Sequence, residues 1–233
     1  MIVRVGLENS ESGQSLAYAL DYPGCVGYGE NGEAALTDIP RAVAAYTEWI
    51  ARHNQGISWL LPGEVEAQLV ETWEIYYLND EFELDPDGEE INAWFLHDWK
   101  PLTQEDVDRG LLMLDWSRED LLGTVEGLSE EKLNRNYPGE RWNIARILNH
   151  IGGSEWWYLD RLGLAFSREH VPAEPYERLS VVREAFKAAL PALVGARQVV
   201  GVAGEFWSPR KMLRRALGHE RDHTQHIHKL LMV

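Results

Sequence analysis

The chain has 233 residues, of which 45% are hydrophobic, and its formal net charge is −16. Its single cysteine, Cys25, excludes an internal disulfide framework and a cysteine-based zinc site, and is typical of a reducing cytoplasm. The sequence shows neither a basic, apolar leader nor an apolar run of the roughly 18 residues that a membrane span needs. We therefore expect a soluble cytoplasmic protein with no membrane partner.

The charge is distributed unevenly along the chain. Residues 1–100 contain four Lys or Arg against nineteen Asp or Glu, whereas residues 101–233 are nearly balanced. Such an asymmetry indicates two modules. Because phosphate binding requires clustered positive charge, we expect no nucleic-acid partner.

The first module alternates apolar and polar residues with the period of a strand over 2–7 and 15–20. A Pro-Gly turn at 23–24 leads into a third short strand, and the apolar spacing over 33–50 predicts a helix. Pro40 lies inside that helix, so we expect a kink or restart near Asp38. The predicted order is β-β-β-α.

Residues 1–52 resemble the HicB-type antitoxin fold. The resemblance rests on Pro23-Gly24-Cys25-Val26, followed by Gly29, Glu33-Ala34-Ala35 and Ala42–Ile50. It implies a small HicB-like domain over residues 1–55, which serves as a surface either for docking a protein partner or for dimerisation. No basic arm or helix-turn-helix accompanies it, so a role in DNA binding is not implied. Residues 56–100 are expected to form an acidic, aromatic-rich connector that packs its aromatic side chains onto the second domain.

The second module, residues 101–233, has the periodicity of helices throughout. Four amphipathic helices are predicted: from about Leu102 to Gly127, from Asn143 to Gly163, over Leu179–Leu193, and from Ser208 onward. Thr103 with Asp106 is a capping pair for the first of them. The predicted fold is therefore α+β, a small β-β-β-α domain followed by an all-α four-helix bundle.

The last predicted helix carries His219, His223, His226 and His228. Because a helix turns by about 100° per residue, the first three lie on one face and His228 points away. Two imidazoles at positions i and i+4 commonly provide two ligands of a divalent metal ion. His150, on the flank of the apolar stripe of the second helix, is the candidate for the third ligand.

The bundle resembles the DinB/YfiT-like family over about residues 103–231. The segment Gly139–Asn143 followed by Ile144–Ile151 is similar to the second helix of that family, and His219-Glu220-Arg221-Asp222-His223 matches the histidine pair of its final helix. The resemblance implies that His150, His219 and His223 bind a divalent metal ion such as zinc or nickel. It also implies transfer or isomerisation chemistry with a low-molecular-weight thiol, and a possible homodimer.

Three further residues of this region have open roles. His226 stands where the family often has Gln, and it is either a neighbour that supports the ligands or a ligand in place of His219, since these two lie about 10.5 Å apart along the axis. Arg215, one turn before His219, is a candidate for binding an anionic substrate group. Glu155 is not on the face of His150, so it is not expected to be a ligand, but it is a candidate acid or base at the rim of the pocket.

Three functions remain open, one of them a stress-linked metal-binding protein without turnover. The first is a metal-dependent enzyme of the thiol-dependent transferase or hydrolase type, acting on a small molecule, with activity that falls as pH drops through the usual histidine range near 6.5. The second is a non-enzymatic interaction protein, in which the HicB-like module docks a partner and the bundle is a scaffold with a vestigial metal site. No separate catalytic residue is identified.

Overall fold

The computed structural model describes residues 1–10, 13–53 and 63–232. The chain divides into two compact units, which are described separately. The first comprises Met1–Lys100 with Gly201–Trp207, and the second comprises Pro101–Val200 with Ser208–Val233. The β-rich region therefore precedes the helical one, as the sequence predicts.

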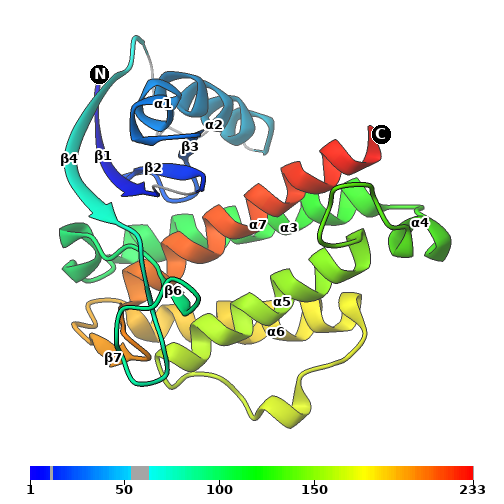
Figure 1. The fold of residues 1–233 in the computed structure, drawn as a ribbon. Coiled ribbons are helices and arrows are strands. Elements are labelled where there is room, and N and C mark those ends of the chain that lie inside the picture. Colours follow the sequence, from blue (N-terminus) through cyan, green and yellow to red (C-terminus); the bar gives the residue numbers. More distant parts are fainter. Residues whose placement is uncertain (11–12, 54–62, 233) are drawn as a thin grey trace. The chain divides into compact units, whose positions relative to one another are not determined.

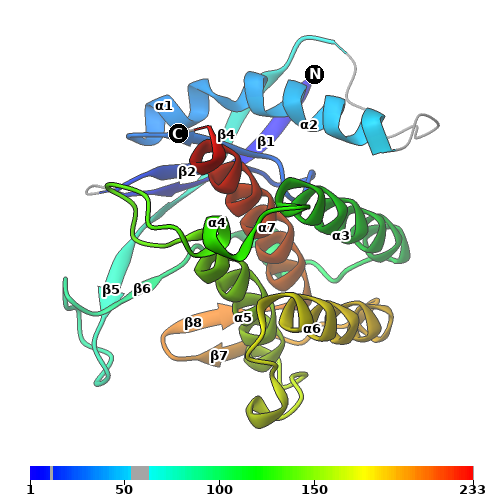
Figure 2. The same cartoon turned by 90° about the vertical axis from the view of Figure 1, so that its right-hand side faces the viewer.

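The first unit is built on a four-stranded sheet of order β3-β2-β1-β4. Its strands are β1 (Ile2–Asn9), β2 (Ser15–Ala19), β3 (Val26–Gly29) and β4 (Glu66–Glu74). Neighbouring strands are antiparallel except β1 and β4, which are parallel. The helices α1 (Gly32–Thr37) and α2 (Ile39–His53) cover one face of the sheet (Figures 1 and 2).

The expected helix break near Asp38 is confirmed, because α1 ends at Thr37 and α2 begins at Ile39. The side chain of Asn31 caps α1 by accepting a hydrogen bond from the backbone N–H of Ala34 at 2.9 Å. A Cβ atom at Gly29 would lie 2.2 Å from the backbone nitrogen of Ala35, so only glycine lets β3 approach α1 this closely.

The expectation of a connector over residues 56–100 needs correction where the structure describes this segment. Its first part forms the edge strand β4, and the next part forms β5 (Tyr76–Leu78) and β6 (Glu89–Ile91), an antiparallel pair followed by the short helix η1 (Leu96–Trp99). Residues 56–62 lie outside the described residues. The sequence does not show this arrangement because β4 pairs with β1, some sixty residues earlier, and no local signal reports such a contact.

The aromatic side chains of this segment pack within the first unit. Phe95 is fully buried, with its ring centroid 5.8 Å from that of Tyr18. A Cβ atom at Gly6 would lie 2.9 Å from the Phe95 ring, so the bare backbone of β1 makes room for it. Phe95 is therefore a core residue of the first unit.

A late hairpin returns to the first unit. It is formed by β7 (Val200–Val202) and β8 (Glu205–Trp207). Within the unit, Glu205 accepts hydrogen bonds from the backbone N–H and the side-chain amide of Asn92, each at 2.8 Å. The domain boundary therefore cannot be drawn at one point of the sequence.

The second unit is a bundle of four long helices, whose arrangement can be followed in Figure 2. They are α3 (Gln104–Val125), α5 (Ile144–Arg161), α6 (Pro175–Ala189) and α7 (Pro209–Leu231), with the shorter α4 (Glu130–Asn134), η2 (Arg168–His170) and η3 (Leu190–Leu193) between them. Helix α5 packs against α6 and α7, and α3 packs against α7. Among the described residues, no helix combines the length and apolar character that crossing a membrane would require.

Three helix starts agree with their sequence signals. Thr103 and Asp106 form a reciprocal capping box on α3, Asn143 caps α5, and Ser208 caps α7 with proline at the first helical position. Helix α6 differs, because it begins at Pro175 rather than Leu179. The side chain of Glu174 caps it by accepting two backbone hydrogen bonds.

The apolar core of the bundle lies between α3, α5, α6 and α7. One cluster of its buried residues consists of Leu121, Val125, Tyr137, Ile144, Ile147, Leu148, Ile151, Leu179, Ile227 and Leu230. Leu121 is fully buried in this core, whereas the side chain of the adjacent Leu122 is exposed.

Candidate metal centre

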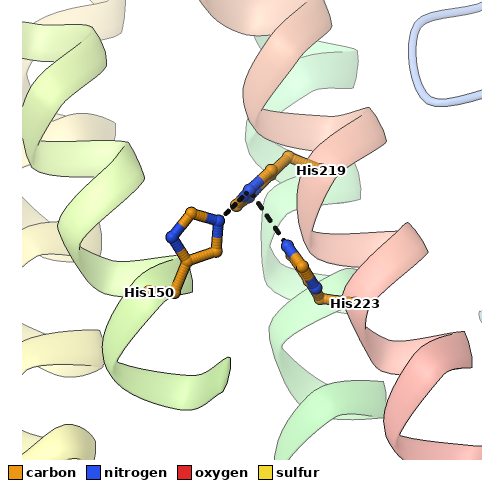
Figure 3. Close-up of side chains that lie close together, drawn as sticks. All are labelled: His150, His219 and His223. Carbon is orange, nitrogen blue, oxygen red and sulfur yellow. Dashed lines mark hydrogen bonds between the residues drawn. The ribbon is translucent and has the colours of Figure 1, made fainter. Parts of the chain in front are cut away.

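Three histidines converge in the bundle, one from α5 and two from α7 (Figure 3). The Nε2 atom of His219 lies 2.9 Å from that of His150 and 3.2 Å from that of His223. One ring nitrogen from each of the three lies within 4.8 Å of the others. The structure thus brings together the three residues that the sequence singles out as ligand candidates.

The two helices hold these rings through their neighbours in sequence. On α5, Ile147 and Ile151 are fully buried on either side of His150 along the chain. On α7, Glu220 and Ile227 are fully buried, which places His219 and His223 on the flank of the helix. The helix period therefore sets the direction of each imidazole once the apolar face is buried.

The donor set fits a divalent metal ion. A zinc ion binds histidine nitrogen at about 2.0–2.1 Å, so two nitrogens of a tetrahedral site lie about 3.3 Å apart. The two shorter Nε2–Nε2 distances are close to this value. Three nitrogen ligands leave one position of a tetrahedral ion open, which is the pattern of catalytic rather than structural zinc sites.

The electrostatics also favour neutral rings. Burial disfavours the protonated form of His150, and the positive charges of Arg141 and of a protonated His223 would repel it. Together these effects lower the pKa of His150 to about 4. Burial and His226 lower the pKa of His223 to about 4, and burial lowers that of His219 well below its usual value. Because only a neutral imidazole can donate its lone pair to a metal ion, these rings are ready to bind one at neutral pH.

One ring lacks a polar anchor. The Nδ1 atom of His223 is buried and has no hydrogen-bond partner among the described residues, whereas most metal-bound histidines donate this hydrogen to a carboxylate or carbonyl. Ring contacts hold it instead, with centroids 4.4 Å from His219 and 6.4 Å from Trp142. The orientation of the His223 ring is therefore set by its packing against the neighbouring rings.

The other two histidines of α7 lie outside this group. His226 pairs with Glu140, its Nε2 atom 2.9 Å from the carboxylate oxygen. The Nε2 atom of His228 lies 3.0 Å from the hydroxyl of Thr124, on the exposed side of the helix. This arrangement leaves His219 as the neighbour of His223 in the converging set.

A cleft of about 580 Å³ opens beside the histidines, with His150 and His219 in its wall. Arg215 lines this cleft, as its predicted role requires, and its guanidinium carbon lies 6.0 Å from the ring centre of Tyr158. Three aromatic side chains and two further arginines contribute to the wall: Trp142, Trp157, Tyr158, Arg146 and Arg178. The open side of the metal site thus faces a basic, aromatic cleft.

A buried ion-pair cluster joins all four long helices behind the site. Its charged members are Arg118 of α3, Glu155 of α5, Arg183 of α6 and Glu220 of α7. Arg118 binds Glu220 at 2.7 Å and Glu155 at 3.2 Å, and Arg183 binds both carboxylates. The expectation that Glu155 lies at the pocket rim is wrong, because it is 1% exposed inside this cluster.

The charges within the cluster balance. Burial by itself would raise the pKa of Glu220, but Arg183 and Arg118 outweigh it and lower that pKa. Burial would likewise lower the pKa of Arg183, but Glu155 and Glu220 raise it. Because Glu220 directly follows His219, the cluster fixes where the first ligand of α7 stands.

Several residues of this region escape prediction from sequence. Arg178 lies before the predicted start of its helix, although Glu174-Pro175 is a recognisable capping signal. The position of Trp142 just before the capping residue Asn143 is the only local indication that its side chain lies near the start of α5. Nothing in the sequence pairs Arg118 or Arg183 with their carboxylates, because each partner lies on another helix.

The bundle with its three-histidine group is similar to a known family, because the model of the DinB superfamily matches residues 113–227. The resemblance of residues 1–52 to HicB-type antitoxins stays a prediction. No curated protein matches the chain.

A solved structure also resembles the chain. It is that of YfiT from Bacillus subtilis, described as a probable metal-dependent hydrolase with an unusual four-helix bundle topology. The identity is 17% and the TM-score 0.46, over 59% of this chain and 94% of YfiT.

Proposed function

We propose that this protein is a metal-dependent enzyme whose zinc or nickel ion is held by His150, His219 and His223. The observation that carries the proposal is the convergence of three Nε2 atoms at 2.9 and 3.2 Å on the wall of a cleft. Imidazole ligands suit both metals. The match to the DinB superfamily supports the proposal, because it covers all three ligands.

Such an ion, when bound, lowers the pKa of a water or thiol at its open position and polarises a substrate oxygen. The residues of the chain supply the rest. Buried, neutral imidazoles leave the ion its full positive charge, Trp142 and Tyr158 shield one side of the site from water, and Arg215 adds positive charge beside His219.

The nucleophile is proposed to be water or a low-molecular-weight thiol. The chain's own cysteine, Cys25, is buried in the first unit, so a thiol would come from outside the protein. Action on a small molecule fits a cleft of about 580 Å³. The homodimer and the docking of a protein partner by the first unit stay predictions.

Metal analysis of the purified protein tests the proposal. The native protein is expected to bind one zinc or nickel ion per chain at micromolar concentration or below, and His219→Ala to weaken binding by at least a hundredfold. His226→Ala is the matched control on the same helix and is expected to bind as the native protein does. A native protein without bound metal would refute the proposal and favour the non-enzymatic function, and a loss confined to His226→Ala would move the site.

A further inference from the structure

The cleft beside the histidines has an unusual charge for this protein. The chain contains 38 acidic and 22 basic residues, yet the cleft is lined by three arginines and no acidic side chain. The arginines come from three helices: Arg146 from α5, Arg178 from α6 and Arg215 from α7. A concave surface of one charge sign concentrates ligands of the opposite sign.

Two of these arginines are not neutralised. Among the described residues, neither Arg146 nor Arg178 has a carboxylate partner, and the guanidinium of Arg146 lies over the Trp142 ring at 5.7 Å. Arg178 is half-buried, and several buried or half-buried arginines of the bundle do pair with a carboxylate, as Arg118, Arg183 and Arg210 show. Positive charge therefore remains available in the cleft.

Arg178 is held in place before any ligand arrives. Its Nε donates to the carbonyl of Pro172 at 2.7 Å, and its Nη1 donates to the carbonyl of Asn149 at 3.4 Å. Of the five N–H groups of a guanidinium, those on Nη2 make no hydrogen bond to the described residues. A fixed guanidinium with a free edge binds a carboxylate or phosphate at a small entropic cost.

Two consecutive glycines of α5 make this position possible. A Cβ atom at Gly152 would lie 2.9 Å from Cγ of Arg178, which is closer than Cβ atoms approach. A Cβ atom at Gly153 would lie 3.9 Å from Nη1 of Arg178, which is ordinary van der Waals contact. The long side chain therefore lies across the bare backbone of α5 on its way to the cleft. Glycine inside a helix is less stable than alanine, so the close approach of Arg178 to α5 has a stability cost.

The remaining wall is aromatic. Trp142, Trp157 and Tyr158 line the cleft, and the Trp142 ring lies 4.5 Å from that of His150. Flat rings of this kind stack on a planar apolar group, and they strengthen hydrogen bonds nearby by excluding water. The cleft thus offers an anion-binding part and a stacking part next to the metal ligands.

We propose that the cleft binds a small aromatic oxyanion, a carboxylate or phosphate ester, with Arg178 as its fixed anchor and Arg146 and Arg215 as further cationic contacts. This names the substrate class of the site and so rests on the proposed function for its catalytic meaning. The binding itself needs only the arginines and the rings.

Calorimetric titration of the full-length protein, with and without zinc, tests the proposal. The probes are benzoate, phenyl phosphate and the uncharged benzamide. At least one anion is expected to bind both forms of the protein, at least tenfold more tightly than benzamide, and to bind more weakly as salt increases. Which anion binds more tightly identifies carboxylate or phosphate as the natural group.

Three variants assign the binding to the cleft. Arg178→Gln is expected to weaken the anion by about ten- to a hundredfold while the zinc affinity stays unchanged. The side chain of Arg146 is exposed and makes no hydrogen bond to the described backbone, so Arg146→Gln is expected to fold normally and to weaken anion binding severalfold. This variant keeps the test valid if Arg178→Gln fails to fold. Arg197→Gln, an exposed arginine of the same unit away from the cleft, is expected to have no effect.

Several results would overturn the proposal: no binding of either anion, equal binding of benzamide, or anion binding that needs zinc and ignores both cleft variants. If zinc fails to bind but Arg178-dependent anion binding persists, the metal-dependent function falls and the anion site stands. If zinc binds as expected and the anions do not bind, the anion site is refuted and the metal-dependent function stands.

Discussion

Replacing Arg183 by methionine should strongly destabilise the bundle. Arg183 is 3% exposed and binds the carboxylates of Glu155 and Glu220, which are 1% and 0% exposed. The change leaves two buried carboxylates facing the single guanidinium of Arg118. Methionine fills much of the same volume, so the effect reports the lost charge more than a cavity.

The magnitude follows from the burial of the partners. Removing one member of a buried ion pair costs about 3–5 kcal/mol, because the partner left behind is a charge without water or counter-ion. For a protein of this size, 1 kcal/mol corresponds to roughly 2–4 °C in the midpoint of thermal unfolding. We therefore expect Arg183→Met to lower that midpoint by about 6–20 °C.

Helix α6 offers a matched control one turn further on. Lys187 pairs with Asp115 at 2.6 Å, but this pair is partly exposed. Exposed ion pairs contribute about 0–1 kcal/mol, so Lys187→Met should shift the midpoint by a few degrees at most. Thermal and urea unfolding followed by circular dichroism measure both variants under the same conditions.

A double variant tests the electrostatic reason. Arg183→Met with Glu155→Gln leaves Arg118 and Glu220 as a neutral pair, so about half of the lost stability should return. If Arg183→Met costs no more than Lys187→Met, or if the double variant is as unstable as the sum of the single ones, the account of a charge-balanced cluster is refuted.

The remaining predictions concern the pH dependence of zinc binding and of stability, and the glycines Gly152 and Gly153. Burial lowers the pKa of His150 and His223 to about 4 and that of His219 well below its usual value, so zinc affinity should change by less than about twofold between pH 7 and 5.5. Ligands of ordinary pKa would each lose about tenfold over this range, and a decline centred on pH 6.5 would contradict the prediction. In the metal-free protein the unfolded state takes up protons first, so the free energy of unfolding should fall as pH drops from about 6.5 to 4. Gly153→Ala should raise the stability of the helix by about 0.5–1 kcal/mol, whereas Gly152→Ala should give no such gain and should weaken benzoate binding; equal gains in unfolding assays, with unchanged binding, would remove the role assigned to the close contact.

Short-range signals in the sequence determined much of this protein. The capping residues Asn143 and Ser208 indicated the starts of the two helices that carry the histidines, and Pro40 indicated the break between α1 and α2 at Asp38. The spacing of His219 and His223 placed both on one side of α7. All of these depend on contacts within about one helical turn, which the sequence records directly.

Tertiary structure decided what depends on distant pairing. The strand β4 joins β1 in parallel, and residues 201–207 return to the first unit; neither has a local signature. The cluster around Arg183 takes one charged member from each of the four long helices. Only packing of the helices reveals that Glu155 is a buried counter-ion and that Arg178 reaches the cleft.

The candidate metal centre combines both kinds of information. The sequence by itself determined which side chains are candidate ligands, because imidazoles at helical spacing and a third one on another amphipathic helix offer three nitrogen atoms. The fold decided that these nitrogens meet at about 3 Å, that their pKa values fall with burial, and that their open side faces arginines rather than acids. The physical reason is that residue type and helix period are local properties, whereas distance, desolvation and the sign of the surrounding charge arise only when the helices pack.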